Sequence, residues 1–173
     1  HYGKDGGIEL YDASVEENGS SNALYILDKK LNVTGKIEKL APNEEVYSAR
    51  FMGKTAYFVT YEQVDPLFSA DLSDPENPKI LGALKIPGFS DYLHGYGEGR
   101  LLVIGMETDE AGAQDGVKLS LFDISDPTDV TEVQKTVLEG FYATDLSYNY
   151  KLAAIDSKQN LIGFSAYGDG THY

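Results

Sequence analysis

Short apolar runs recur along the chain from about residue 23, separated by Gly, Pro, Asp and Asn. Within these runs apolar and polar positions mostly alternate, and few segments keep the 3.6-residue apolar period of an amphipathic helix. Apolar runs such as residues 101–104 have the length of a strand and fall far short of the ~20 residues that a membrane-spanning helix needs. The pattern therefore predicts an all-β fold of many short strands, without membrane insertion by this segment.

The first 22 residues have a different composition, rich in Gly, Asp, Glu, Ser and Asn. Only residues 8–11 have the apolar character of a strand, and residues 16–22 are typical of a polar loop. We therefore expect residues 1–22 to form a polar leader with one strand, and residues 23–173 to form the main domain.

A motif repeats within that domain. An apolar strand ends in an aspartate at Asp28, Asp71 and Asp123, and the last two aspartates are each followed by a Ser-Asp-Pro sequence. The three aspartates are 43 and 52 positions apart, and the longer interval contains an acidic insertion of about nine residues near 107–117. Without the insertion the period is about 43, within the ~40–45 residues of a four-stranded β-propeller blade.

Each copy of the repeat divides into short strands. We expect a type I turn with proline at 73–76 and again at 125–128, and we expect each strand-end aspartate to accept hydrogen bonds from nearby backbone amides. The predicted strands are 46–51, 55–61, 67–72 and 79–86 in one copy, 90–94, 100–106, 119–124 and 131–138 in the next, and 142–147, 152–155 and 162–167 in the last.

The repeat favours a β-propeller over the alternative, a β-sandwich. A sandwich also contains short strands and frequent turns. It has no reason to place the same strand-end motif at a fixed interval, whereas propeller blades repeat by construction. The repeat covers about 142 residues, which corresponds to about three to four blades, while propellers typically close with four to eight. We therefore expect a partial ring, and a fragment of a larger propeller.

The repeat also resembles a known family. The stretches that carry the resemblance are residues 46–53, 56–60, 63–68, 71–78, 86–90, 92–94 and 119–127. They are similar to the bacterial and archaeal secreted β-propeller domain family that is distantly related to WD repeats. The resemblance extends over roughly residues 24–164. It implies a WD-like propeller that is secreted or displayed on the cell surface, and it implies no catalytic residues.

Charge and composition exclude several classes of function. The chain has 28 acidic and 14 basic residues, a net charge of −14, and no basic patch, so it should not bind nucleic acid. It has no cysteine, which excludes a disulfide framework, a thiol nucleophile and a thiolate metal site. Its 13 tyrosines suit contact with a protein or a glycan, although blade strands also accommodate tyrosine.

The first strand of each blade supplies the candidate ligand-binding residues. In a propeller this strand lines the central channel, where ligands often bind. Arg50, Asp91, His94 and Asp145 lie on or near the first strands of their blades. The alternative is structural, because first strands are half-solvated and carry polar residues for that reason alone.

The acidic insertion is a candidate metal site. Asp109, Glu110 and Asp115 could supply oxygen ligands to Ca²⁺, the one cofactor that the sequence suggests. Their spacing does not match an EF-hand loop, and an acidic hairpin tip is the simpler account, which we prefer.

Two functions remain open from the sequence. The first is a non-catalytic extracellular binding or scaffold module for a protein or a glycan. The second is a propeller-type enzyme acting on extracellular polysaccharide or peptide with the help of Ca²⁺, which requires Asp91, His94 and Asp145 to converge. The open sheet edges of an incomplete ring also predict self-association, or pairing with the rest of a larger propeller.

Overall fold

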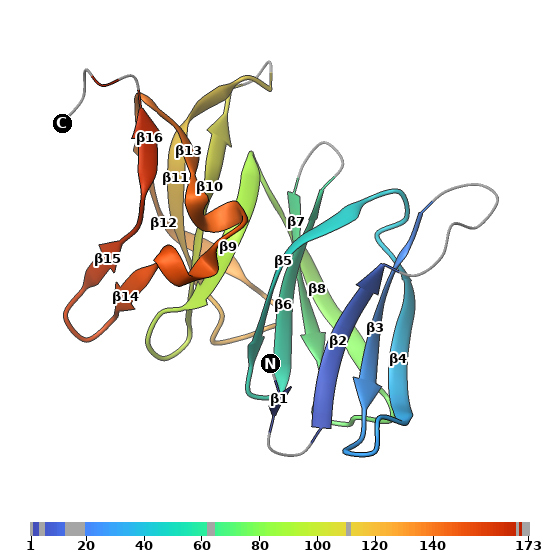
Figure 1. Cartoon of the computed structure of the whole chain (residues 1–173). Coiled ribbons are helices and arrows are strands. Elements are labelled where there is room, and N and C mark those ends of the chain that lie inside the picture. The colour runs from blue at the N-terminus through green and yellow to red at the C-terminus, as the bar shows by residue number, and fades with distance from the viewer. Residues whose placement is uncertain are drawn as a thin grey trace.

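The computed structural model describes residues 2–3, 6–12, 20–61, 65–109, 112–168 and 170. Its sheets follow one another across the molecule in chain order, from blue to red in Figure 1. Three sheets have four antiparallel strands each. The first contains β1 (Tyr2–Gly3), β2 (Gly6–Asp12), β3 (Asn22–Leu27) and β4 (Val33–Leu40); the second contains β5 (Glu45–Met52), β6 (Thr55–Tyr61), β7 (Asp65–Asp71) and β8 (Lys79–Ile86); the third contains β9 (Phe89–Gly95), β10 (Arg100–Thr108), β11 (Gln114–Asp123) and β12 (Thr131–Leu138).

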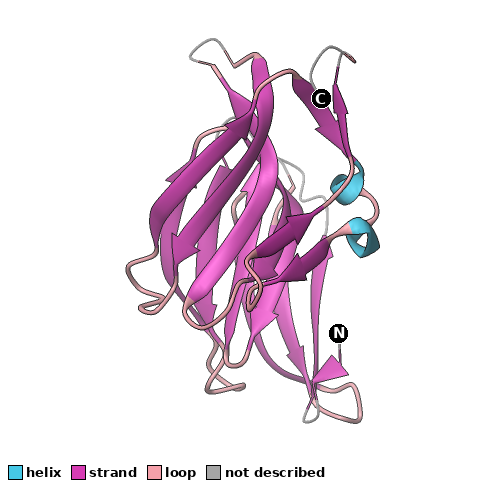
Figure 2. Cartoon of the chain, turned by 90° about the vertical axis from the view of Figure 1, so that its left-hand side faces the viewer, coloured by secondary structure: helices cyan, strands magenta, loops and turns pink. Residues whose placement is uncertain are grey.

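The second and third sheets contain the eight strands that the repeat predicts for them, in the predicted order. The first sheet extends further toward the N-terminus than the repeat alone indicates. The strand expected at residues 8–11 is part of β2, and β2 pairs along its length with β3. The fold is therefore all-β, as Figure 2 shows, with two short 3-10 helices at one side.

The last part of the chain departs from the four-stranded pattern. It contains β13 (Phe141–Thr144), the 3-10 helices η1 (Asp145–Ser147) and η2 (Tyr150–Leu152), β14 (Ala154–Asp156), β15 (Leu161–Gly163) and β16 (Ala166–Gly168). The prediction of one strand over residues 162–167 is wrong. β15 pairs with β14, whereas β16 turns back to pair with β13. The reason lies at Asp145, whose carboxylate accepts hydrogen bonds from Ser165 and Tyr167 and so holds this segment beside β13.

Along the central strands of the sheets, alternate residues bury their side chains against the two neighbouring sheets. On β6, Phe58 packs toward the first sheet with Leu24, whereas Val59 packs toward the third sheet with Leu101. A further cluster around Ile104 joins the third sheet to the last part of the chain. The core therefore lies between successive sheets, which is how propeller blades pack. The sheets are open, and they do not close a ring in the described residues.

The strand-end aspartates make the hydrogen bonds expected of them. Asp71 and Asp123 each accept the backbone N–H two residues on at 2.9 Å, and Asp28 accepts the equivalent N–H at 2.7 Å. The backbone N–H and the hydroxyl of Ser125, with Arg100, lower the pKa of Asp123 to about 2. Each strand-end aspartate therefore fixes the path of the chain out of its strand.

The Ser-Asp-Pro sequences form turns one residue later than predicted. The closing hydrogen bonds run from the Asn77 N–H to the Asp74 carbonyl and from the Asp129 N–H to the Asp126 carbonyl, so proline occupies the second position of each turn. Each turn packs on the outer strand of the preceding sheet. A Cβ at Gly35 would overlap the turn that follows β7, and one at Gly82 would lie 3.3 Å from the turn that follows β11. The repeated turn thus joins neighbouring sheets.

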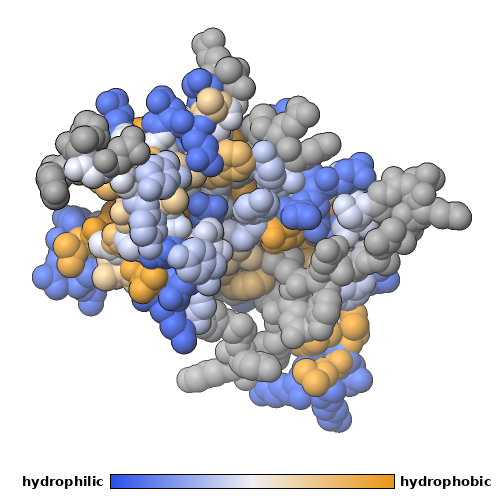
Figure 3. Space-filling model, turned by 45° about the horizontal axis from the view of Figure 1, so that its top comes forward, coloured by the Kyte–Doolittle hydropathy of each residue, from blue (hydrophilic) through white to orange (hydrophobic). Residues whose placement is uncertain are grey.

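The exposed apolar residues are spread over the surface. Figure 3 shows apolar areas in orange between hydrophilic areas in blue. No helix in the part of the chain that the structure describes is long and apolar enough to cross a membrane.

Candidate functional site

The first strands of the second and third sheets, β5 and β9, place their candidate residues at equivalent positions of the repeat. Arg50 pairs with Tyr57 and His94 pairs with Leu102, which are the third residues of β6 and β10. Arg50 and His94, called here the basic pair, are therefore counterparts in neighbouring sheets. Repetition of the blade brings two basic side chains to the same level of the inner surface.

Three positions earlier, both strands contain a β-bulge. The register of β5 with β6 shifts between Val46 and Ser48 and skips Tyr47, and the register of β9 with β10 skips Asp91 in the same way. Tyr47 and Asp91, called here the bulge pair, are again counterparts. Bulges re-aim side chains, and they are frequent next to binding sites for that reason.

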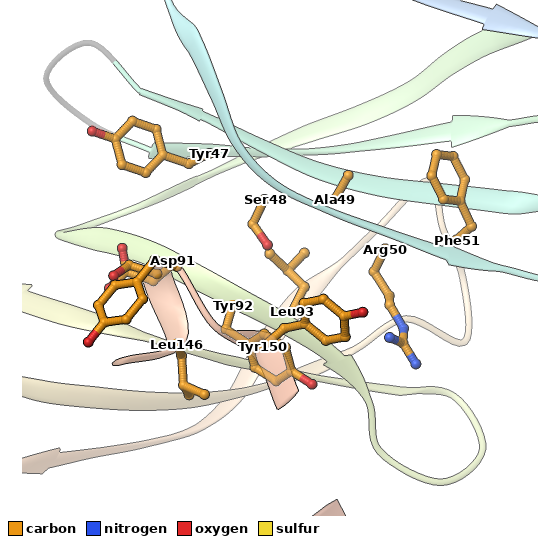
Figure 4. Close-up of a pocket in the computed structure, with 12 residues that line it drawn as sticks. Tyr47, Ser48, Ala49, Arg50, Phe51, Asp91, Tyr92, Leu93, Leu146 and Tyr150 are labelled. Atoms are coloured by element: carbon orange, nitrogen blue, oxygen red, sulfur yellow. The ribbon is translucent and has the colours of Figure 1, made fainter. Parts of the chain in front are cut away.

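The pocket that these strands border has a volume of about 730 Å³, which is in the usual range for small-molecule sites. Arg50 and Asp91 both line it. In Figure 4, Asp91 lies toward one end and Arg50 toward the other, with the rings of Tyr92 and Tyr150 between them. The remaining wall residues come from β5, from β9, from η1 and from the residue that follows η1: Tyr47, Ser48, Ala49, Phe51, Leu93, Leu146, Ser147 and Tyr148.

Three tyrosines in the pocket wall have unusually exposed rings. Tyr148 is 75% exposed, Tyr150 58% and Tyr47 47%. An exposed tyrosine offers a flat apolar face together with a hydroxyl, which suits stacking on a ligand or contact with a cation. None of these three residues is among the candidates that the sequence suggests. The abundance of tyrosine was the available signal, but it did not distinguish wall positions from strand positions.

Of the basic pair, Arg50 carries a positive charge that no acidic side chain among the described residues pairs with. Among the described residues, Arg50 forms no ion pair, whereas Arg100 on β10 is paired with Asp123. His94 is half-buried, and its Nδ1 lies 2.8 Å from the Tyr92 hydroxyl. Burial, and then the charge of Arg50, lower the pKa of His94. The positive charge at this end of the pocket therefore resides on Arg50.

Asp91 supplies a negative charge at the opposite end of the pocket from Arg50. Burial raises the pKa of Asp91, and the charge of Lys118 on β11 opposes the rise. The carboxylate of Asp91 accepts no hydrogen bond from the described residues. Lys118 is itself fully buried, and its Nζ donates to the carbonyl oxygen of Pro87. A cation that approached Asp91 from the pocket would stabilise a carboxylate that burial destabilises.

Asp145 lies behind the pocket wall. It is 7% exposed, and its carboxylate accepts hydrogen bonds from the hydroxyls of Tyr148, Ser165 and Tyr167, the last two at 2.7 Å and 2.9 Å. Tyr148, followed by Ser165, lowers the pKa of Asp145, and the carboxylate in turn raises the pKa of Tyr148 to about 12. Asp145 therefore positions Tyr148 in the wall.

Of the four residues that the sequence suggested as ligand-binding, two line the pocket. They are Arg50 and Asp91. His94 and Asp145 do not line it, but each forms a hydrogen bond with a wall residue, His94 with Tyr92 and Asp145 with Tyr148. The four are thus connected to one site at different depths, and whether they bind a ligand stays a prediction.

Two of the candidate Ca²⁺ residues lie elsewhere: Asp109 directly follows β10, and Asp115 is the second residue of β11. The Asp109 carboxylate accepts the N–H of Ala113 at 2.8 Å, and Asp115 is exposed. Glu110 lies outside the described residues. No cluster of three or more His, Asp or Glu side chains that could hold a metal ion occurs in the described ranges. Within these ranges the hairpin-tip interpretation fits Asp109, and the Ca²⁺ site stays a prediction.

A model of the beta propeller domain family matches residues 10–173. The chain belongs to that family. Over 149 residues, 86% of its length, it is 44% identical to an uncharacterised protein of Archaeoglobus fulgidus. It is also 44% identical over 147 residues, 85% of its length, to an uncharacterised protein of Methanocaldococcus jannaschii. The chain spans 23% of the length of each of these relatives.

Proposed function

We propose that this propeller chain is a non-catalytic, extracellular binding module whose ligand occupies the pocket between β5, β9 and the 3-10 helices. The observation that carries the proposal is the wall of this pocket, which combines three exposed tyrosine rings with the cation of Arg50 and the carboxylate of Asp91. Rigid aromatic surfaces with a few placed charges are typical of recognition sites. The extracellular location rests on the family resemblance of the repeat.

The positions of the acidic groups support binding over hydrolysis. An acid–base mechanism needs two titratable groups within reach of one reacting atom. Of Asp91, His94 and Asp145, only Asp91 lines the pocket, and the carboxylate of Asp145 already accepts three hydroxyls. This arrangement favours a site that holds a ligand unchanged.

A labelled form of the protein should be tested on a glycan array and on a peptide array. We expect ligands on one of the arrays to be retained by the wild type and lost by Tyr150→Ala. The control is Leu161→Ala on β15, because Leu161 is 56% exposed but lies outside the pocket wall. Absence of any ligand on both arrays, or ligands retained by Tyr150→Ala, would contradict the proposed site. Ligand hydrolysis abolished by Asp91→Asn would contradict the non-catalytic role.

We also propose that the chain pairs with further repeats of a larger propeller. Each described sheet buries an apolar cluster against the next, whereas the last part of the chain leaves Tyr142, Leu152 and Leu161 exposed. The much greater length of the relatives agrees with additional blades. Alone, the chain should use these surfaces to associate with itself, and light scattering should show a mass that rises with concentration. A stable monomer over the whole range would argue against this proposal.

A further inference from the structure

We infer that the pocket recognises a dipolar ligand of tripeptide length, with its ammonium group at the bulge pair and its carboxylate group at Arg50. This inference rests on the proposed function and names the class of ligand for the same pocket. It follows from the two charged groups in the wall, from their spacing along the inner strands, and from the charge of the whole chain.

The bulge pair provides what an ammonium group needs. Asp91 is half-buried and accepts no hydrogen bond in the described part of the chain, and the charge of buried Lys118 offsets the effect of burial on its pKa only in part, so a bound cation would stabilise its carboxylate. Tyr47 shares this end, because Tyr47 and Asp91 also line together a smaller adjoining cavity of about 270 Å³. A ring face beside a carboxylate attracts cations through both the ring quadrupole and the full charge.

Arg50 of the basic pair provides the positive charge and the hydrogen-bond donors that a ligand carboxylate needs. The guanidinium of Arg50 is half-buried, faces no acidic partner among the described residues, and presents several donors that match a carboxylate in a bidentate fashion. In a chain with twice as many acidic as basic residues, an unpaired arginine inside a pocket is informative. A ligand carboxylate would supply the counter-ion that the chain itself does not.

The spacing between the two ends sets the length of the ligand. Arg50 follows Tyr47 by three positions on β5, and His94 follows Asp91 by three positions on β9. Asp91 lies at the level of the bulges and Arg50 three strand positions further along, so at about 3.3 Å per position their offset along the strands is at most roughly 10 Å. An extended chain of three residues covers a similar distance of roughly 10 Å. The aromatic and leucine side chains between the ends would then contact the middle of a short peptide.

The net charge of −14 favours a peptide over an acidic glycan. A polyanion would be repelled by the field of the whole chain before it reached Arg50. A neutral glycan would displace water from Arg50 and Asp91 without supplying an opposite charge to either of them. Removing a charged group from water without such compensation costs free energy. A short peptide with free ends has no net charge and satisfies both groups.

The test uses the tripeptide Ala-Leu-Ala and two capped forms, one acetylated at its amino end and one amidated at its carboxyl end. Isothermal titration calorimetry should show that the free peptide binds and that each cap weakens binding about tenfold or more, because each removes a charge-assisted contact. Arg50→Gln should remove the effect of the amide cap and keep that of the acetyl cap. Asp91→Asn should do the reverse.

Arg100→Gln is the matched control, because Arg100 is the other arginine of the chain and is paired with Asp123 outside the pocket. Both caps should weaken binding to this variant as they do for the wild type. Equal binding of free and capped peptides, or cap effects that persist in Arg50→Gln and Asp91→Asn, would overturn the inference. Failure of all three peptides to bind, with a Tyr150-dependent glycan found on the array, would overturn the inference and leave the proposed function standing.

Discussion

Replacing Gly105 with alanine should deform the bulge that turns Asp91 into the pocket. Gly105 on β10 pairs with Ser90 beside this bulge. A Cβ at Gly105 would overlap the carbonyl oxygen of Phe89, and it would lie 2.7 Å from the carbonyl carbon of Phe89 and 2.9 Å from the Cα of Ser90. All of these are backbone atoms, so no rotation of a side chain can relieve the overlap.

The expected cost follows from the displacement that the methyl group requires. Carbon atoms in contact are normally about 3.5–4.0 Å apart, so β9 must move away by about 1 Å. Added atoms that force a backbone shift in a packed interior cost about 1–3 kcal/mol. We expect a loss of about 2 kcal/mol in the free energy of unfolding, because β10 is buried between two sheets and cannot move instead. Ligand binding at the Asp91 end of the pocket should weaken in parallel.

Urea denaturation followed by circular dichroism measures this loss as a lower midpoint at an unchanged slope. Gly163→Ala on β15 is the control, because the nearest atoms to a Cβ at Gly163 are 3.8 Å away and the backbone there has no positive φ. This control should stay within about 0.5 kcal/mol of the wild type or gain slightly. A Gly105→Ala variant as stable as Gly163→Ala would refute the account of the bulge.

Three further predictions test other parts of the structure. Phe58, 1% exposed and stacked on Phe68 at 5.1 Å, should lose about 3–5 kcal/mol on replacement by alanine, and a loss below about 1 kcal/mol in denaturant would contradict the packing of the first two sheets. Tyr148→Phe removes a hydroxyl that lowers the pKa of Asp145, so NMR titration should show this pKa moving up toward its ordinary value, whereas an unchanged pKa would exclude the hydrogen bond. Because the folded pKa of Asp123 is lowered to about 2, its stabilising effect should be complete above about pH 4 and disappear as the pH falls toward 2. Thermal unfolding of Asp123→Asn should therefore depend less on pH over that interval, and an equal dependence would contradict the role of this carboxylate.

The sequence predicted the parts of the fold that depend on local chemistry. Asp71 and Asp123 each need only the backbone amide two residues on, so their role can be inferred from a short motif. The return of β16 to β13 depends instead on Asp145, whose hydroxyl partners Ser165 and Tyr167 lie about 20 residues away. A pattern of alternating residues carries no information about such a contact, so the last strand was predicted in one piece.

The candidate site likewise contains residues that the sequence could indicate and residues that it could not. Arg50 and Asp91 could be selected because the first strand of a blade faces inward, which is a property of the whole fold. Tyr47 could not, because its orientation depends on a bulge, and a bulge appears only in the register between two strands. Tyr148 and Tyr150 lie at the 3-10 helices η1 and η2, between the strands predicted at 142–147 and 152–155, where the pattern predicts no element.

The repeat separates positions that keep the same residue in successive copies from positions that vary. At the end of the third strand, successive copies keep the same residue, because Asp28, Asp71 and Asp123 perform the same backbone-fixing role. At the inner surface, equivalent positions diverge: one bulge holds a tyrosine and the next an aspartate, and an arginine corresponds to a histidine. A blade needs only a strand that can pair at these positions, so packing does not require such different side chains. A pocket assembled from several blades requires different side chains at equivalent positions of a repeated backbone, because each blade contributes a different contact to one ligand.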